Sequence, residues 1–190
     1  MANLSSLFTL CLLTIMSVTS PATAAFWKTV KTRPFKLGTT KLSHFQFFWH
    51  DTQSGSNPTS INIVKPPPRN TTFPTGFGIV NVIDDPLTDK PEFNGSRMLG
   101  RAQGFYGLVS QEEHALLMGM TFVFSTGRYS GSTLTVLGRN PVFQRVREMP
   151  VIGGTGLFRF ARGYVKATTH TLNTKTRDVI VRYNVCVLHY

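Results

Sequence analysis

Residues 97–138 read RMLGRAQGFYGLVSQEEHALLMGMTFVFSTGRYSGSTLTVLG, and this stretch decides the fold class. It contains three short runs, 97–108, 116–125 and 132–138, in which apolar side chains tend to recur at every second position. A period of two is typical of β-strands, whose side chains point alternately to the two faces of a sheet. Ser and Gly residues separate the runs, which predicts strands joined by short connections.

One segment of this stretch also fits the start of a helix. Ser110 is followed three residues later by Glu113, as in a capping box, and an apolar run comes next. That run has a glycine at its centre and ends in the β-favouring residues TFVF. We therefore expect a single turn at 110–113 and then a strand.

The same pattern extends in both directions along the chain. Helical periodicity is almost absent, and no internal repeat is visible. The further strands are predicted at 42–50, 59–65, 77–83, 142–151, 157–169 and 178–188. Eight or nine short strands without intervening helices predict an all-β barrel or sandwich, with short turns or helical insertions at most.

Two strands suggest a pocket inside such a fold. In the first strand an aromatic row on one face ends in an acid, Asp51, which places that acid at a barrel mouth or beside a pocket. In the strand 157–169 one face carries only small residues, namely Ala161, Gly163, Val165, Ala167 and Thr169. A small-residue face favours a cavity, although small residues also face large ones across packed cores.

Composition narrows the class of protein. The chain has 190 residues, of which 41% are hydrophobic and 12% aromatic, so intrinsic disorder is not expected. The one long apolar run lies at the N-terminus, and no later run is long enough to span a membrane. The length suits one domain with a sizeable core.

The N-terminal run predicts secretion. Residues 1–24 are typical of a signal peptide that ends in a small-residue cleavage site, although a buried N-terminal helix is the alternative. A basic, mobile arm at 25–40 and one domain at 41–190 follow. Cleavage would remove Cys11 and leave Cys186 alone, without an intramolecular disulfide. Two sequons, at Asn70 and Asn94, predict an extracellular glycoprotein.

The net charge of +11 points to an acidic partner. Nucleic acid is disfavoured because the predicted protein is exported and because its aromatic residues are not interleaved with charges on one strand. An acidic cell-wall polysaccharide is the more suitable partner for this positive charge. The alternative is that the charge only improves the solubility of the protein.

Few catalytic signatures are present. The chain lacks G-x-S-x-G and H-E-x-x-H motifs and paired cysteines, so we expect neither a metal nor a cofactor and no oxidase activity of its own. The segment 84–88, DDPLT, is foremost a turn signal. Asp51 is the better candidate acid, because its aromatic neighbours would desolvate the carboxyl and raise its pKa. Its structural alternative is a strand-end Asp that bonds a turn amide.

Several ordered motifs resemble those of plant dirigent proteins. The similarity extends from about Lys41 to Tyr190. The motifs are FWHD (48–51), DDPLT (84–88), GRAQGFY (100–106), FVF (122–124), YSGSTL (129–134), VLGRN (136–140), REMPVIGGTG (147–156) and FRFARGY (158–164).

The resemblance implies a fold and a function. It implies an eight-stranded antiparallel β-barrel with a central phenolic pocket, assembled as a homotrimer and secreted to the apoplast. Dirigent proteins give stereoselectivity to the coupling of phenoxy radicals in phenylpropanoid metabolism, such as coniferyl alcohol radicals that form optically active lignans. An external laccase or peroxidase supplies the radicals. A chiral pocket needs to favour one approach by only about 1.4 kcal/mol for tenfold selectivity.

The resemblance also assigns site residues by motif. Asp51 and Arg147 are the expected catalytic residues. Tyr106, Asn140 and Thr169 are the expected substrate-binding residues. Core packing of Tyr106 and pairing of Arg147 with an acid across the barrel wall are the structural alternatives.

Two departures favour a particular branch of the family. Lignan-forming members have an acid where this chain has Asn140, and an amide cannot transfer a proton as an acid does. Lignan-forming members also have a disulfide, whereas Cys186 would be the single cysteine of the mature chain. Both features resemble the dirigent-b/d branch, which includes pterocarpan synthases. An isoflavanol dehydratase acting through a quinone methide is therefore the alternative function, and a wall polysaccharide-binding protein is a third.

Overall fold

The computed structural model describes residues 37–65 and 74–190. The predicted signal peptide (1–24), residues 25–36 of the predicted arm and the sequon at Asn70 lie outside the described residues. Residues 37–40 are exposed and precede the first strand. Within the described ranges, no helix has the length and apolar character needed to cross a membrane.

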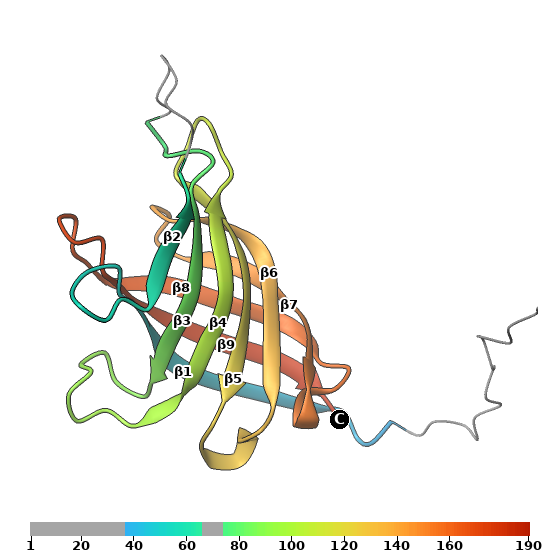
Figure 1. The fold of residues 1–190 in the computed structure, drawn as a ribbon. Helices are drawn as coiled ribbons and strands as arrows, with labels where there is room; N and C mark the ends of the chain where they lie inside the picture. The colour runs from blue at the N-terminus through green and yellow to red at the C-terminus, as the bar shows by residue number, and fades with distance from the viewer. Residues whose placement is uncertain (1–36, 66–73) are drawn as a thin grey trace, which may run out of the picture. The chain divides into compact units, whose positions relative to one another are not determined.

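The described chain is a single antiparallel sheet with two one-turn 3₁₀ helices (Figure 1). Around the sheet the strand order is β1-β9-β8-β7-β6-β5-β4-β3-β2. The elements are β1 (Lys41–Asp51), β2 (Ser60–Val64), β3 (Val80–Thr88), β4 (Met98–Leu108), β5 (Ala115–Phe124), η1 (Gly127–Tyr129), β6 (Thr133–Pro141), β7 (Arg147–Thr155), η2 (Gly156–Phe158), β8 (Arg162–Leu172) and β9 (Val179–His189).

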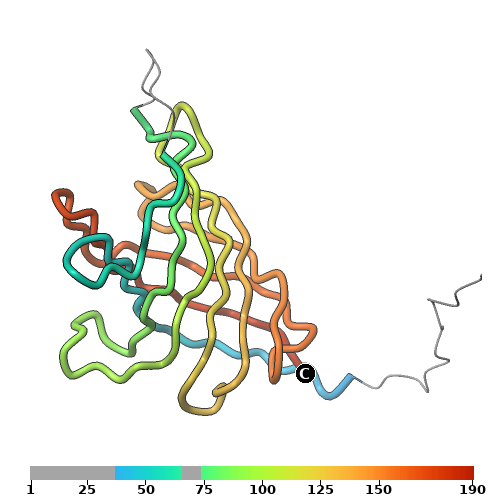
Figure 2. The backbone as a smooth tube through the Cα atoms, in the orientation of Figure 1, coloured from blue at the N-terminus to red at the C-terminus, as the bar shows by residue number. Residues whose placement is uncertain are grey.

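Nine strands occupy eight positions around the barrel because β1 and β2 pair with the same edge of β3. Trp49 of β1 pairs with Leu87, whereas β2 pairs with residues 80–83 of β3. Residues 52–59 form the loop between β1 and β2, which can be followed in the chain trace (Figure 2). Since β1 also pairs with β9 along its length, the sheet closes on itself. The all-β fold class and the eight-stranded barrel are confirmed.

The DDPLT segment is strand, so the predicted turn at 84–88 is wrong. These residues form the second half of β3. Proline is tolerated there because the strand faces the loop between β1 and β2. The Asp84 amide bonds the carbonyl of Thr59, and two residues later Pro86, which has no N–H, faces the same open side.

Two other predicted strands begin too early. Residues 142–146 form an exposed turn, so the strand predicted at 142–151 becomes β7 at Arg147–Thr155. Phe143 is 74% exposed there, which shows that an apolar residue alone does not define a strand. The strand predicted at 157–169 begins only at Arg162, and Phe158 belongs to η2 and is fully buried. The strand expected at 116–125 is confirmed as β5 (Ala115–Phe124), and residues 111–113 before it form a bend and no helix.

Aromatic rings fill the middle of the barrel. Tyr183 stacks on Phe47 at 5.8 Å and meets Phe122 edge-on at 5.5 Å. Ala167 of β8 is the register partner of Tyr183, so the small face of β8 provides room for this ring. Each buried ring of this kind stabilises the fold by roughly 1.5–3 kcal/mol. The middle is therefore packed, and the cavity lies at one end.

An apolar row crosses the outer surface of the barrel. Ile61 pairs with Val82, Val82 with Phe105, Phe105 with Gly119, and Gly119 with Leu137. All four large side chains of this row are between 43% and 57% exposed. The Phe105 ring lies over Gly119, where an added Cβ would be 3.0 Å from the ring. A continuous apolar row on the outside of a β-barrel is typical of a contact surface.

Candidate functional site

The residues assigned by motif lie at one end of the barrel, which we call the mouth. Asp51 ends β1 and Arg147 begins β7. Tyr106, Asn140 and Thr169 lie near the C-terminal ends of β4, β6 and β8. In an antiparallel sheet the end of one strand lies beside the start of the next, so these positions share one rim. All five side chains belong to inward-facing positions of their strands.

Asp51 and Tyr106 are in direct contact. The Tyr106 hydroxyl donates to Asp51 Oδ2 at 2.9 Å. It accepts hydrogen bonds from Gln53 Nε2 and Asn81 Nδ2, each at 3.0 Å, and lies 3.0 Å from Ser60 Oγ. This phenol is therefore a fixed donor to Asp51. Burial, followed by the nearby charge of Asp51, raises the Tyr106 pKa and keeps the hydroxyl protonated.

The Asp51 carboxyl is buried among polar side chains. It is 3% exposed, and burial raises its pKa to about 6, although hydrogen bonding by Tyr106 opposes the shift. The second carboxyl oxygen, Oδ1, is buried and has no hydrogen-bond partner among the described residues. The structure therefore leaves one oxygen of Asp51 for a bound molecule, with a pKa close to neutral pH.

A second acid, Asp85, faces Asp51. Trp49 pairs with Leu87, where the β1–β3 ladder ends. Asp51 lies two residues beyond Trp49, Asp85 lies two residues before Leu87, and the two carboxyls are close enough for the charge of Asp51 to act on Asp85. Asp85 has no exposed surface. Thr59 Oγ1 donates to its Oδ1 at 2.5 Å, while Oδ2 has no partner among the described residues. Burial and then the charge of Asp51 raise the pKa of Asp85 to about 8.

Arg147 forms the opposite side of the site. Its Nε donates to Asn140 Oδ1 at 3.0 Å, and its Nη1 donates to Thr169 Oγ1 at 2.9 Å. Arg147 is 3% exposed, and none of the ion pairs in the described part of the chain includes it. Burial lowers the pKa of the guanidinium. A buried cation held by neutral partners is suited to bind an anionic or phenolic oxygen.

Tyr183 connects the two groups electrostatically. Its fully buried hydroxyl has no hydrogen-bond partner among the described residues. Burial raises its pKa; the charge of Arg147 opposes this rise, and the charges of Asp85 and Asp51 add to it. An unpaired buried hydroxyl costs about 1–3 kcal/mol, so Tyr183 is a further candidate contact for a bound polar group.

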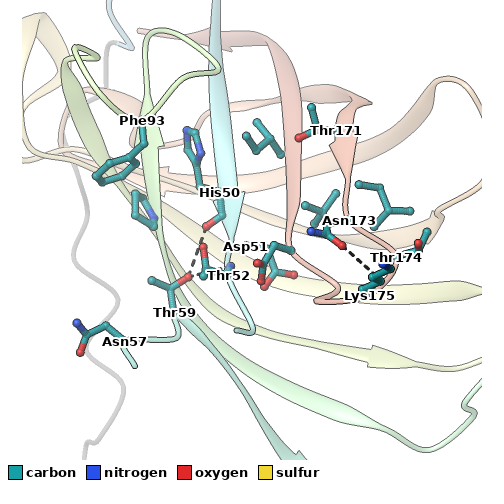
Figure 3. A pocket seen from close by; sticks show the side chains of 15 residues that line it. His50, Asp51, Thr52, Asn57, Thr59, Phe93, Thr171, Asn173, Thr174 and Lys175 are labelled. Atoms are coloured by element: carbon teal, nitrogen blue, oxygen red, sulfur yellow. Dashed lines mark hydrogen bonds between the residues drawn. The ribbon is translucent and has the colours of Figure 1, made fainter. Parts of the chain in front are cut away.

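Two cavities lie near this end of the barrel; Asp51 belongs to the lining of one of them, and neither lining includes Asp85 or Arg147. One, of about 610 Å³, opens at the mouth and is lined by residues that include Gln53, Asn81 and Leu108. The other, of about 880 Å³, lies where β1 ends, against the 52–59 loop and the β8–β9 turn (Figure 3). Asp51 and Thr59 line this second cavity. Both volumes suit a ligand of drug-like size.

No metal site accompanies these groups in the part of the chain that is described. In residues 37–65 and 74–190, no three His, Cys, Asp or Glu side chains lie close enough together to hold a metal ion.

Comparison with known proteins identifies the family. The family model described as "Dirigent-like protein" matches residues 42–188. The chain belongs to the dirigent family. It is 50% identical to Dirigent protein 7 of Arabidopsis thaliana, over 87% of this chain and 86% of the relative. It is also 40% identical to Pterocarpan synthase 1 of Glycyrrhiza echinata, over 90% of each chain.

The fold of this dirigent protein is similar to that of a solved relative. A pterocarpan synthase dirigent protein superposes with a TM-score of 0.74 at 42% identity, covering 82% of this chain and 89% of that chain. This agreement places the chain near the pterocarpan synthase branch that the motifs suggested.

The residues predicted from the sequence of this dirigent protein form two groups. Asp51 and Tyr106 meet in one group, and Arg147, Asn140 and Thr169 meet in the other. Their assigned roles stay predictions. Sequence reasoning missed Asp85, Tyr183 and the amides around Tyr106. The alternation of Ile83, Asp85 and Leu87 was the available signal for Asp85, since these side chains share one face of β3.

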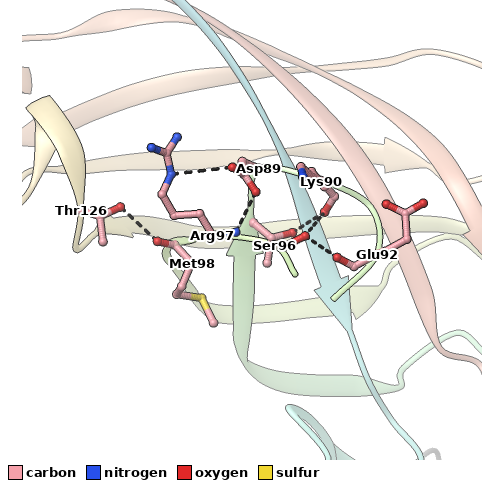
Figure 4. Close-up of polar contacts among 8 residues, drawn as sticks. Asp89, Lys90, Glu92, Ser96, Arg97, Met98 and Thr126 are labelled. Atoms are coloured by element: carbon pink, nitrogen blue, oxygen red, sulfur yellow. Dashed lines mark hydrogen bonds and ion pairs between the residues drawn. The ribbon is translucent and has the colours of Figure 1, made fainter. Parts of the chain in front are cut away.

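The second sequon lies in an exposed loop. Asn94 is exposed between β3 and β4, and the hydroxyl of its sequon partner Ser96 bonds the carbonyl of Glu92 (Figure 4). The loop is pinned by Asp89, whose carboxylate accepts the Arg97 amide at 2.8 Å. Glycosylation of Asn94 stays a prediction.

Proposed function

We propose that this dirigent protein removes water from a phenolic alcohol of the isoflavanol type and controls the closure of the resulting quinone methide. The observation that carries the proposal is the facing pair of buried carboxyls, Asp51 and Asp85, each with an oxygen that has no protein partner among the described residues. Radical coupling needs no acid, whereas elimination of water does.

The pair holds one proton at neutral pH. With a pKa of about 6, Asp51 is about nine-tenths ionised at pH 7. With a pKa of about 8, Asp85 is about nine-tenths protonated at the same pH. Two facing acids with separated pKa values supply an acid and a base together. The Tyr106 hydroxyl supports this division, because it donates to Asp51.

The reaction follows from that division. Asp85 gives its proton to the benzylic hydroxyl, the carbon–oxygen bond breaks and water leaves. The Asp51 carboxylate takes the proton of the conjugated phenol, which leaves a neutral quinone methide. A second hydroxyl of the same molecule then adds to the electrophilic carbon and gives its proton to Asp85, while Asp51 returns its proton to the phenolic oxygen. One water is lost, and nothing is oxidised.

The remaining groups position the substrate. Arg147, held by Asn140 and Thr169, is placed to bind a phenolic oxygen on the side of the site opposite the acids. The apolar barrel interior keeps bulk water from the quinone methide until the ring closes. The chiral arrangement of the acids and Arg147 then favours one face of attack.

The test is chiral chromatography of products from the purified mature protein. One reaction contains a racemic isoflavanol and no oxidant, and a parallel reaction contains coniferyl alcohol with a laccase. We expect turnover in the first, and Asp51→Asn or Asp85→Asn should slow it by about 10²–10⁴-fold. Asp84→Asn is the matched control, since Asp84 is the neighbouring residue, is exposed and pairs with Arg101 at 2.6 Å. It should change the rate by less than about twofold.

Three results would contradict the proposal. Enantiomeric excess in the coupling reaction alone would assign the protein to radical coupling. Full activity of Asp85→Asn would show that the acid pair does not carry the reaction. Absence of product control in both reactions, with the protein folded, would exclude the isoflavanol as substrate and so contradict the proposal.

A further inference from the structure

The outer face of β1, β9 and β8 is basic. Register pairing places Arg162 and Lys166 four residues apart on β8, and Arg182 opposite Thr168 on the neighbouring strand β9. All three basic side chains are exposed. At about 3.3 Å per residue, Arg162 and Lys166 are separated by about 13 Å along the strand. Together these residues form a basic row along two paired strands.

Acidic side chains gather elsewhere on the barrel. The three ion pairs of the described residues join Asp89 to Arg97, Asp84 to Arg101 and Glu113 to Arg139, all on or beside β3–β6 (Figure 4 shows the first). None of these pairs includes a residue of the basic row. The acid that faces the basic row is Glu148 of β7, the register partner of Lys166. The carboxylate of Glu148 and the ammonium of Lys166 are too far apart to form an ion pair.

Polar and aromatic groups accompany the basic row. Tyr164 lies between Arg162 and Lys166 on the same face, and Lys166 Nζ is 5.4 Å from the centre of its ring. Gln46 and Asn184 continue the register row of Lys166 across β9 and β1. The face therefore offers cations, amides and one partly exposed ring on a surface that belongs to regular sheet.

We propose that this face, defined by Arg162, Tyr164, Lys166, Arg182 and Asn184, binds a linear acidic polysaccharide that carries carboxylates. Cations spaced along extended strands match negative charges repeated along an extended chain. The amides bond hydroxyl groups, and the ring offers a flat apolar contact. The face is separate from the mouth, because its side chains point outward from strands whose alternate residues line the core. Binding to the wall polymer and turnover of phenolics can therefore proceed together.

The charge asymmetry provides a matched experiment. The variant R162Q/K166Q/R182Q removes three charges from the basic row. The control R97Q/R128Q/R139Q removes three charges from exposed arginines elsewhere, so both proteins have the same net charge. Binding of the mature protein to polygalacturonate is measured against neutral dextran at low and high salt. Unfolding midpoints verify that both variants are folded.

We expect the parent protein to bind polygalacturonate but not dextran, with affinity that falls as salt rises. The basic-row variant should lose about tenfold in affinity, and the control less than about threefold. Isoflavanol turnover should be unchanged in both variants. Equal losses in the two variants would overturn the site, because net charge alone would then explain binding. Tighter binding to RNA or to anionic vesicles than to polygalacturonate would overturn the ligand class.

Discussion

Replacing Asp85 by asparagine should make the protein more stable while it removes activity. The carboxyl is fully buried and accepts a short hydrogen bond from the Thr59 hydroxyl, and the Trp49 side chain is a weaker donor to it. Burial and the charge of Asp51 raise its pKa from 3.8 to about 8, so the ionised form is strongly disfavoured in the folded state. An amide has the same shape and no charge, and it avoids this cost.

The size and sign of the effect follow from proton linkage. The folded state binds the Asp85 proton more tightly than the unfolded state, so stability is lost as pH rises from 3.8 toward 8. At pH 7 the loss amounts to about 4 kcal/mol, since 3.2 pH units separate 3.8 from 7 and each is worth about 1.4 kcal/mol. At pH 5 the loss is only about 2 kcal/mol. The advantage of Asp85→Asn should therefore grow by about 2–3 kcal/mol between pH 5 and pH 7.

Urea unfolding of the parent protein, Asp85→Asn and Asp84→Asn at pH 5, 6 and 7 measures this directly. The Asp85→Asn curve should separate from the parent as pH rises, and the exposed control should stay within about 1 kcal/mol of it. Parallel curves for the parent protein and Asp85→Asn would refute the reasoning, because Asp85 would then titrate normally and could not hold a proton at neutral pH.

Three further substitutions test other parts of the structure. Tyr106→Phe removes the donor to Asp51, so the pKa of Asp51 should rise and the acidic limb of the pH–rate profile should move up by about one pH unit. Gly163→Ala would place a Cβ 2.1 Å from the Cys186 carbonyl oxygen, and urea unfolding should show a free energy of unfolding lower by about 2 kcal/mol or more. Gly153 has open space around its Cα, so the control Gly153→Ala should change the free energy of unfolding by less than about 1 kcal/mol. Phe105→Glu places a charge in the apolar row and should convert the predicted homo-oligomer to monomers in light scattering, whereas an unchanged mass would place the contact elsewhere.

The alternation of apolar and polar residues predicted strands correctly where one face of the strand is buried. The runs at 97–108 and 116–125 correspond to β4 and β5, because the alternation of side chains is present in the sequence of each strand by itself. Pattern failed where apolar residues are exposed, as at Phe143, or where a turn-forming sequence is used as strand, as at Pro86. In both places the neighbouring chain decides the outcome, and a local pattern contains no information about it.

The same distinction applies to the site. Motif similarity selected Asp51 and Tyr106, which are 55 residues apart in sequence and 2.9 Å apart in space. It did not select Asp85, because DDPLT has the composition of a turn. Asp85 comes near Asp51 only because β1 and β3 pair inside the barrel, and these strands are far apart in the sequence.

By itself, the sequence determined the all-β class, the approximate strands and a set of polar residues that belong to one family, because side-chain alternation and motifs are local properties. The tertiary structure decided that nine strands occupy eight positions, that the middle of the barrel is packed while its mouth is open, and that Asp51 and Asp85 are buried near each other. These features depend on closure of the sheet. Closure fixes which strands face each other and removes Asp51 and Asp85 from water together, and that joint burial is what raises both pKa values toward neutrality.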